Sequence, residues 1–214
     1  MTWTRWAPWT GVAFVVFFVG GVVASSPPSE SASNAAWIAD YATHSKQVLH
    51  VASGAFLVLA GLSLMIFLTQ LWATVAAAHP RPTNPLPVVA AGVTTTCMCV
   101  GGMLMMSVSG LTLSGAPLPP PYWMRFGNDV GFVFVGVPGM LAMAIGLVCL
   151  AGQAYAAGVF GRRMRWFTYL VAALLLASFL FIPIGGLMIW TLIVTYIQVR
   201  RPYAAAVVSP VPMV

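Results

Sequence analysis

The titratable residues that could do acid–base or metal chemistry are few, and the best-placed pair is Asp40 and His44. Residues four apart lie on one turn of a helix, so this carboxylate and imidazole would be neighbours. With His50 nearby, they could form a metal or proton site. His44 and His50 would point about 120° apart on an ideal helix, so they would not share a face. The alternative is that all three are ordinary polar residues at a membrane boundary.

A second group of candidate ligands is a concentration of sulfur atoms in one apolar stretch, which would suit a soft ion such as copper(I). These candidates are Cys97, Cys99, Met103, Met105 and Met106. The two cysteines would point about 200° apart on a helix, so a second helix would have to supply further ligands. Methionine and cysteine also fill gaps between packed helices, and we favour that interpretation. We therefore predict neither a bound metal nor any other cofactor.

The composition identifies the environment in which these residues must be placed. Of the 214 residues, 60% are hydrophobic and only 6% are charged, and the mean hydropathy is +0.94. About a quarter of the residues of a soluble domain are charged, so this chain is predicted to be an integral membrane protein. It has no phosphate-binding loop, no zinc-protease motif and no basic aromatic patch. We therefore expect neither an enzyme nor a nucleic-acid partner.

The apolar runs predict an all-α bundle of six transmembrane helices that forms one domain over residues 1–214. The predicted spans are about residues 9–25, 46–77, 88–113, 129–158, 166–182 and 187–199. The last two come from one uncharged run that is too long for a single crossing and is interrupted by Pro183. Pro138, which lies between two glycines, predicts a kink or a local opening in the fourth span.

The first outer loop is the most polar stretch, and residues 33–45 of it are predicted to form a short amphipathic helix at the membrane interface. Trp37, Ile38 and Tyr41 would occupy one face of that helix, with Asp40 and His44 on another.

The positions of the nine basic residues predict the orientation of the bundle. Six spans place seven of them on the side of both termini, namely Arg5, Arg81, Arg162, Arg163, Arg165, Arg200 and Arg201. Lys46 and Arg125 fall on the other side. Because positive loops stay inside, we expect a protein of the plasma membrane with both termini in the cytoplasm.

Several residues are candidates for contacts with partner subunits. Gly139 and Gly146 are seven apart and would form a small-residue stripe of the kind that membrane helices use to pack. Trp190 lies deeper than the interfacial belts, so its indole N–H needs a partner in this chain or in a neighbouring subunit. We favour the neighbouring subunit. Trp37 and Tyr41 complete the predicted interface set.

Three loose motifs carry a resemblance that covers most of the length. They are Trp6-Ala7-Pro8 before the first span, the stretch from Ile38-Ala39-Asp40-Tyr41 into Ser53-Gly54-Ala55-Phe56-Leu57, and an arginine-rich turn before a final hairpin that holds Trp190 and ends in Arg200-Arg201. In these the chain resembles a group of uncharacterised six-span membrane proteins from actinobacteria. The resemblance implies a fold and no activity.

The function predicted from these observations is a non-enzymatic one. No ionisable residue is expected near the middle of any span, which argues against a proton-coupled pump or an ion carrier. We expect an accessory or stabilising subunit of a larger cell-envelope complex, in contact with lipids and other integral membrane subunits. The alternative is a small transporter or binding protein for an apolar, lipid-like ligand or for copper(I).

Overall fold

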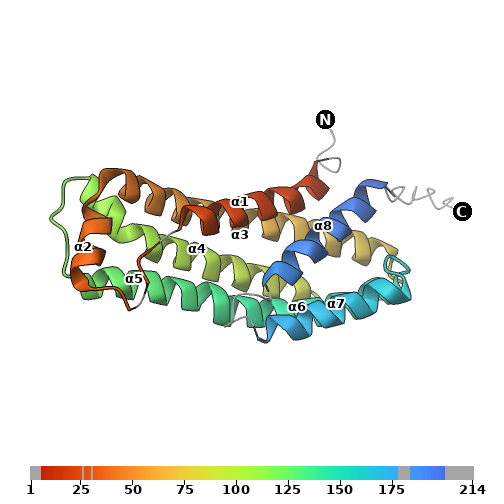
Figure 1. Cartoon of the computed structure of the whole chain (residues 1–214). Helices are drawn as coiled ribbons and strands as arrows, with labels where there is room; N and C mark the ends of the chain where they lie inside the picture. The colour runs from red at the N-terminus through yellow and green to blue at the C-terminus, as the bar shows by residue number, and fades with distance from the viewer. Residues whose placement is uncertain (1–5, 26, 30, 178–183, 201–214) are drawn as a thin grey trace, which may run out of the picture.

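The computed structural model describes residues 6–25, 27–29, 31–177 and 184–200, in which every regular element is a helix (Figure 1). The elements in chain order are η2 (Ala7–Trp9), α1 (Thr10–Ala24), α2 (Asn34–Ala42), α3 (His44–Ala78), α4 (Leu86–Leu113), α5 (Pro121–Phe134), the π-helical turn η3 (Val135–Gly139), α6 (Met140–Ala156), α7 (Arg162–Leu175) and α8 (Ile184–Arg200). The prediction of an all-α bundle is confirmed for these residues.

Four helical segments of the described chain are long and apolar enough to cross a membrane. They are Ala7–Ala24, His44–Ala78, Leu86–Leu113 and the continuous rod Pro121–Ala156. The helices in the region of the last two predicted spans are shorter, with 14 residues in α7 and 17 in α8. At 1.5 Å per residue, α7 is only about 21 Å long, so it falls short of a hydrocarbon core of about 30 Å. Four spans are therefore supported among the described residues, and the predicted count of six is not confirmed.

The centre of the bundle is the antiparallel pair α3 and α4. A Cβ at Gly102 would lie 2.6 Å from the carbonyl oxygen of Gly54, so only glycine allows the two backbones to approach so closely. The Thr95 hydroxyl donates to the Gly61 carbonyl at 2.9 Å and links the same two helices. α1 packs on α3, whereas α5 and α6 pack on α4.

The predicted opening at Pro138 is present as the π-helical turn η3. Proline has no N–H, so one helical hydrogen bond is missing there, and π-turns are a common result. The Thr94 hydroxyl of α4 donates to the Gly139 carbonyl at 2.8 Å and so links α4 to the end of this turn. α5, η3 and α6 thus form one rod with a local change of helical pitch.

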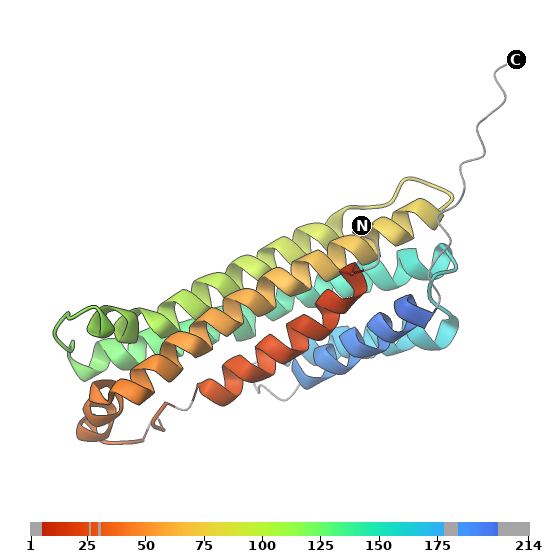
Figure 2. The same ribbon diagram turned by 90° about the horizontal axis from the view of Figure 1, so that it is seen from above.

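The bundle has two unequal halves (Figures 1 and 2). One end carries the beginning of α1, the beginning of α7 and the end of α8, and we call this the terminal half. The other end carries α2, the beginning of α3 and α5, and the end of α4, and we call this the α2 half. α8 packs on α1 and α7, and α7 packs on α6, so this pair covers the terminal half alone.

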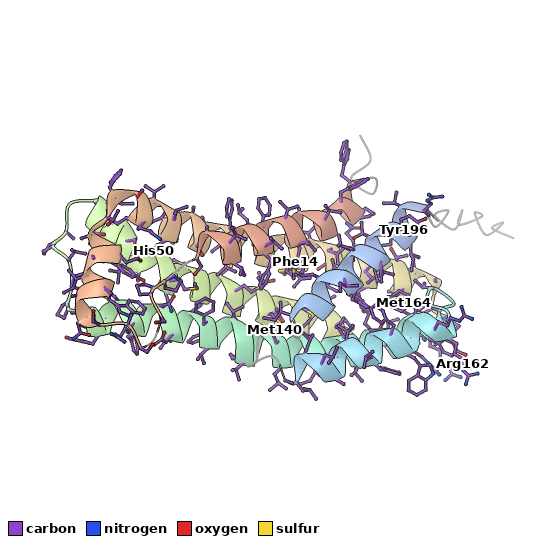
Figure 3. The ribbon with its side chains drawn as sticks, viewed as in Figure 1. Phe14, His50, Met140, Arg162, Met164 and Tyr196 are labelled. Atoms are coloured by element: carbon purple, nitrogen blue, oxygen red, sulfur yellow. The ribbon has the colours of Figure 1, made fainter. Side chains whose placement is uncertain are left out.

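The described basic residues are divided unequally between the same two ends. Arg81, Arg162, Arg163, Arg165 and Arg200 lie at the terminal end, whereas Lys46 and Arg125 lie at the α2 end. Figure 3 shows the contrast between Arg162 at one end and His50 near the other. The predicted segregation is present among the described residues, and the cytoplasmic location of the termini stays a prediction.

The predicted interface residues lie inside this chain, which corrects their assignment to a neighbouring subunit. Trp190 is completely buried, its indole N–H donates to the Thr168 hydroxyl at 2.9 Å, and its ring meets Phe67 edge-on. Trp190 thus finds its polar partner on α7, because the two short helices pack against each other.

The two glycines of the predicted stripe bury α6 and η3 against α4. A Cβ at Gly139 would lie 3.1 Å from the Cβ of Cys97, and one at Gly146 would lie 2.6 Å from that of Ala90. The stripe predicted from the sequence is therefore a contact between helices of one chain.

Candidate functional site

A cluster of polar side chains joins α2, α3 and α4, and we call it the Asp40 cluster: Asp40, Lys46, His50 and Ser109. The Asp40 carboxylate lies 3.1 Å from His50 Nε2 and 3.6 Å from Lys46 Nζ. The predicted pairing of Asp40 with His44 is wrong, and His44 is exposed. The reason is a break at Thr43 (φ −81°, ψ 118°), which ends α2 and turns the chain into α3.

The second ring nitrogen of His50, Nδ1, shares a 3.0 Å hydrogen bond with the Ser109 hydroxyl. The order carboxylate, imidazole, hydroxyl is that of a serine hydrolase triad. Ser109 is 0% exposed, so its hydroxyl does not meet a substrate in this conformation. We interpret the contacts as a polar link that holds α2 against α3 and α4.

The Tyr41 ring lies between this cluster and Trp37. It stacks on Trp37 at a centroid distance of 6.0 Å and lies 4.5 Å from the His50 ring. Burial, and then the negative charges of Asp40 and Asp129, raise the pKa of Tyr41 to about 12. Tyr41 and Trp37 pack with Met124 of α5. The segment predicted as a helix, residues 33–45, holds the helix Asn34–Ala42, and both aromatic rings face the bundle. Its location at a membrane interface stays a prediction.

A groove of about 660 Å³ opens beside Trp37, between the end of α1 and the rod formed by α5 and η3. We call it the α1–α5 groove. Its lining residues are Val22, Ser25, Pro27, Pro28, Ser29, Trp37, Asn128, Asp129, Phe132, Val133, Gly136 and Val137. The groove lies in the α2 half, where α7 and α8 do not cover the bundle (Figure 1). Its wall is mostly apolar, with a few polar groups.

Two of these polar groups have unused hydrogen-bonding or charge capacity. The buried indole N–H of Trp37 has no acceptor among the described residues. The exposed carboxylate of Asp129 accepts from the Asn128 side-chain amide at 3.2 Å, and none of the described cations forms an ion pair with it. A buried donor without a partner costs about 1–3 kcal/mol.

The five sulfur candidates are distributed around α4. Cys97 is buried beside Gly139, and Met105 is buried as well, whereas Met103 is 59% exposed. Among the described residues, no three His, Cys, Asp or Glu side chains lie close enough to hold a metal ion. Cys97 lies beside η3, Met105 beside α5 and Met106 beside α3, so these predicted sulfur ligands contact different helices.

No family model, curated protein or solved structure matches this chain. The resemblance to the actinobacterial group stays a prediction.

Two functional candidates, Ser109 and Asp129, were not recognised in the sequence. Ser109 is one of many serines in apolar stretches, and nothing local indicates that it faces His50. Asp129 could have been recognised from the sequence, because it is one of only three acids in the chain. It follows Asn128 within an apolar helix, and an ionisable residue in such a position indicates a functional site.

Proposed function

We propose that this is a non-enzymatic membrane protein that binds an amphipathic, lipid-like molecule in the α1–α5 groove. The observation that carries the proposal is the groove itself, with apolar walls and polar groups of Trp37, Asn128 and Asp129. Its volume of about 660 Å³ lies within the range of about 300–1,000 Å³ that is usual for ligand sites. Such sites combine apolar lining with a few polar groups that orient the ligand.

The groove favours this function over the one that we expected from the sequence. The accessory-subunit hypothesis rested mostly on what the sequence lacks, namely a catalytic set, an intramembrane charge and a soluble domain. Its candidate contact residues all pack within the chain; they are Trp190, Gly139, Gly146, Trp37 and Tyr41. It remains a second candidate because one row of aromatic rings on α5 is exposed, made of Tyr122, Trp123 and Phe126. Copper(I) binding has less support, because the sulfur atoms are not gathered.

The setting of the proposed site is the plasma membrane, with both termini in the cytoplasm. Under that orientation the groove faces the outer part of the bilayer. This orientation is supported by the separation of basic residues between the two ends of the bundle.

Photochemical labelling in lipid vesicles tests the proposal. A long-chain alcohol with a diazirine in its tail should label Phe132 and Val137 in a saturable manner, because the groove is a finite site. Val133→Trp, which fills the groove from a position that is 55% exposed, should abolish saturable labelling. Val148→Trp is the matched control, since Val148 on α6 is 51% exposed and does not line the groove. Labelling that rises linearly in the wild-type protein would contradict the proposal.

A further inference from the structure

The Asp129 carboxylate indicates which head group the groove would take. Asp129 is exposed on α5, and it lines the groove together with Phe132 and Val133. A carboxylate within an apolar helix of a membrane protein is costly unless a cation pairs with it. Its contact with the Asn128 amide is a hydrogen bond at 3.2 Å and does not neutralise the charge.

The described cations of the α2 half are directed elsewhere. Lys46 lies 3.6 Å from Asp40. Arg125 is one helical turn before Asp129, but its guanidinium lies over the Trp37 ring at 5.1 Å. The same group donates to the Ala32 carbonyl at 2.7 Å and to the Asn34 side chain at 3.2 Å. Among the described residues Asp129 is thus left without an ion pair, and an occupant of the groove could supply the cation.

The electrostatics of the neighbouring tyrosine agree with this charge. Burial raises the pKa of Tyr41 most, and the negative charges of Asp40 and Asp129 raise it further, so the charge of Asp129 acts on this end of the bundle.

We propose that the groove binds an amphiphile with a cationic amine head group, held by the carboxylate of Asp129 while its apolar tail lies along Val22, Phe132 and Val137. This inference rests on the proposed function and specifies its ligand class. The amine has two possible sources, a free long-chain amine or the ethanolamine head group of a membrane lipid. Both present the same ammonium group to Asp129.

A competition experiment tests the inference. Saturable labelling of the groove is measured once with a long-chain diazirine amine and once with the diazirine alcohol, and an unlabelled competitor is then added. Dodecylamine should displace the probe about tenfold more effectively than dodecanol, which corresponds to one ion pair in a partly dehydrated site. Asp129→Asn should abolish that preference, whereas Asp129→Glu, which keeps the charge, should retain it. Thermal unfolding of each variant in detergent controls for loss of fold.

The outcomes separate the two proposals. If the groove labels saturably but dodecylamine and dodecanol compete equally, the head-group inference is wrong and the proposed function stands. A preference for the amine that survives Asp129→Asn also overturns the inference. If neither probe labels the groove saturably, the proposed function itself is wrong. Competition by phosphatidylethanolamine would identify a membrane lipid as the source, and competition by dodecylamine alone would identify a free amine.

Discussion

Two large buried tryptophans, Trp190 in the terminal half and Trp37 in the α2 half, differ in how their indole N–H groups are satisfied. In the terminal half, the Trp190 N–H donates to the Thr168 hydroxyl at 2.9 Å. In the α2 half, the Trp37 N–H has no acceptor among the described residues. The terminal half also holds a buried polar atom without a described hydrogen-bond partner, Gln153 Oε1. The comparison therefore concerns the two tryptophans: the chain itself fixes Trp190, whereas Trp37 keeps an unused donor.

The largest effect expected from this comparison is on stability in the terminal half. Trp190→Ala should lower the free energy of unfolding by about 3–5 kcal/mol, because it leaves a cavity beside Phe67. Trp190→Phe should cost about 1–2 kcal/mol through the lost hydrogen bond to Thr168. Unfolding of both variants in mixed micelles measures these values. Trp166→Ala is the control, since Trp166 is exposed. An equal cost for Trp166→Ala and Trp190→Ala would contradict the assignment of Trp190 to the core.

The contact between α4 and α5 provides the next test, in the α2 half. Gly101→Ala should destabilise the protein by about 1–3 kcal/mol, because its Cβ would lie 2.6 Å from the Gly131 carbonyl oxygen. Gly110→Ala on the same helix meets no atom within 4 Å, so it should be neutral or slightly stabilising. The same unfolding measurement applies. A neutral Gly101→Ala would show that α4 and α5 can separate, and that the groove wall is not rigid.

The ionisation of Tyr41 tests whether the charge of Asp129, in the groove, acts on the residues beside the Asp40 cluster. Its pKa should be about 12, against an ordinary value of 10.0. Because the pKa of Tyr41 is higher in the folded state than in the unfolded state, the free energy of unfolding falls as the pH rises from 10 to 12. Below pH 10 the side chain is protonated in both states, so its ionisation does not reduce stability there. Tyrosinate absorbance of the wild-type protein minus that of Tyr41→Phe isolates this residue. Asp129→Asn should lower its pKa, and an unchanged value would show that the groove carboxylate does not act on Tyr41.

The smallest effects are expected at the solvent side of the Asp40 cluster. Lys46→Met should change stability by less than about 1 kcal/mol, since the side chain is 40% exposed and its distance to Asp40 is long. Ser109→Ala should cost more, about 1–2 kcal/mol, because it removes a buried partner of His50. Chemical unfolding at neutral pH ranks the two. The reverse order would mean that the exposed ion pair, and not the buried hydrogen bond, holds this cluster.

Hydropathy predicted the helices closely where one apolar run forms one helix. The predicted spans 9–25 and 88–113 agree within two residues with α1 and α4. The helix that carries the fourth predicted span begins at Pro121, before the predicted start of that span at about residue 129. Asn128 and Asp129 suggested a membrane boundary, and the structure places both within this helix, beside the groove. The end of the predicted span 166–182 lies outside the described residues.

The candidate site could be predicted only in part, because its contacts depend on how distant segments meet. Asp40 and His50 were recognised as the relevant residue types, but the break at Thr43 decides which histidine faces the carboxylate. Trp190 was correctly expected to need a polar partner at its depth. The sequence does not reveal that Thr168 supplies it, because that depends on the packing of α7 against α8.

The π-helical turn Val135–Gly139 also has a geometric consequence for the rod Pro121–Ala156. Each residue of an α-helix turns the chain by about 100°, so one extra residue in a turn changes the angular phase of everything that follows. The turn therefore rotates the faces of the helix after it relative to the faces before it. Before it, Asp129 and Phe132 line the α1–α5 groove; after it, Met143 and Leu147 lie in the packed core. A single rod can therefore form the wall of a groove in one half of the bundle and part of the core in the other.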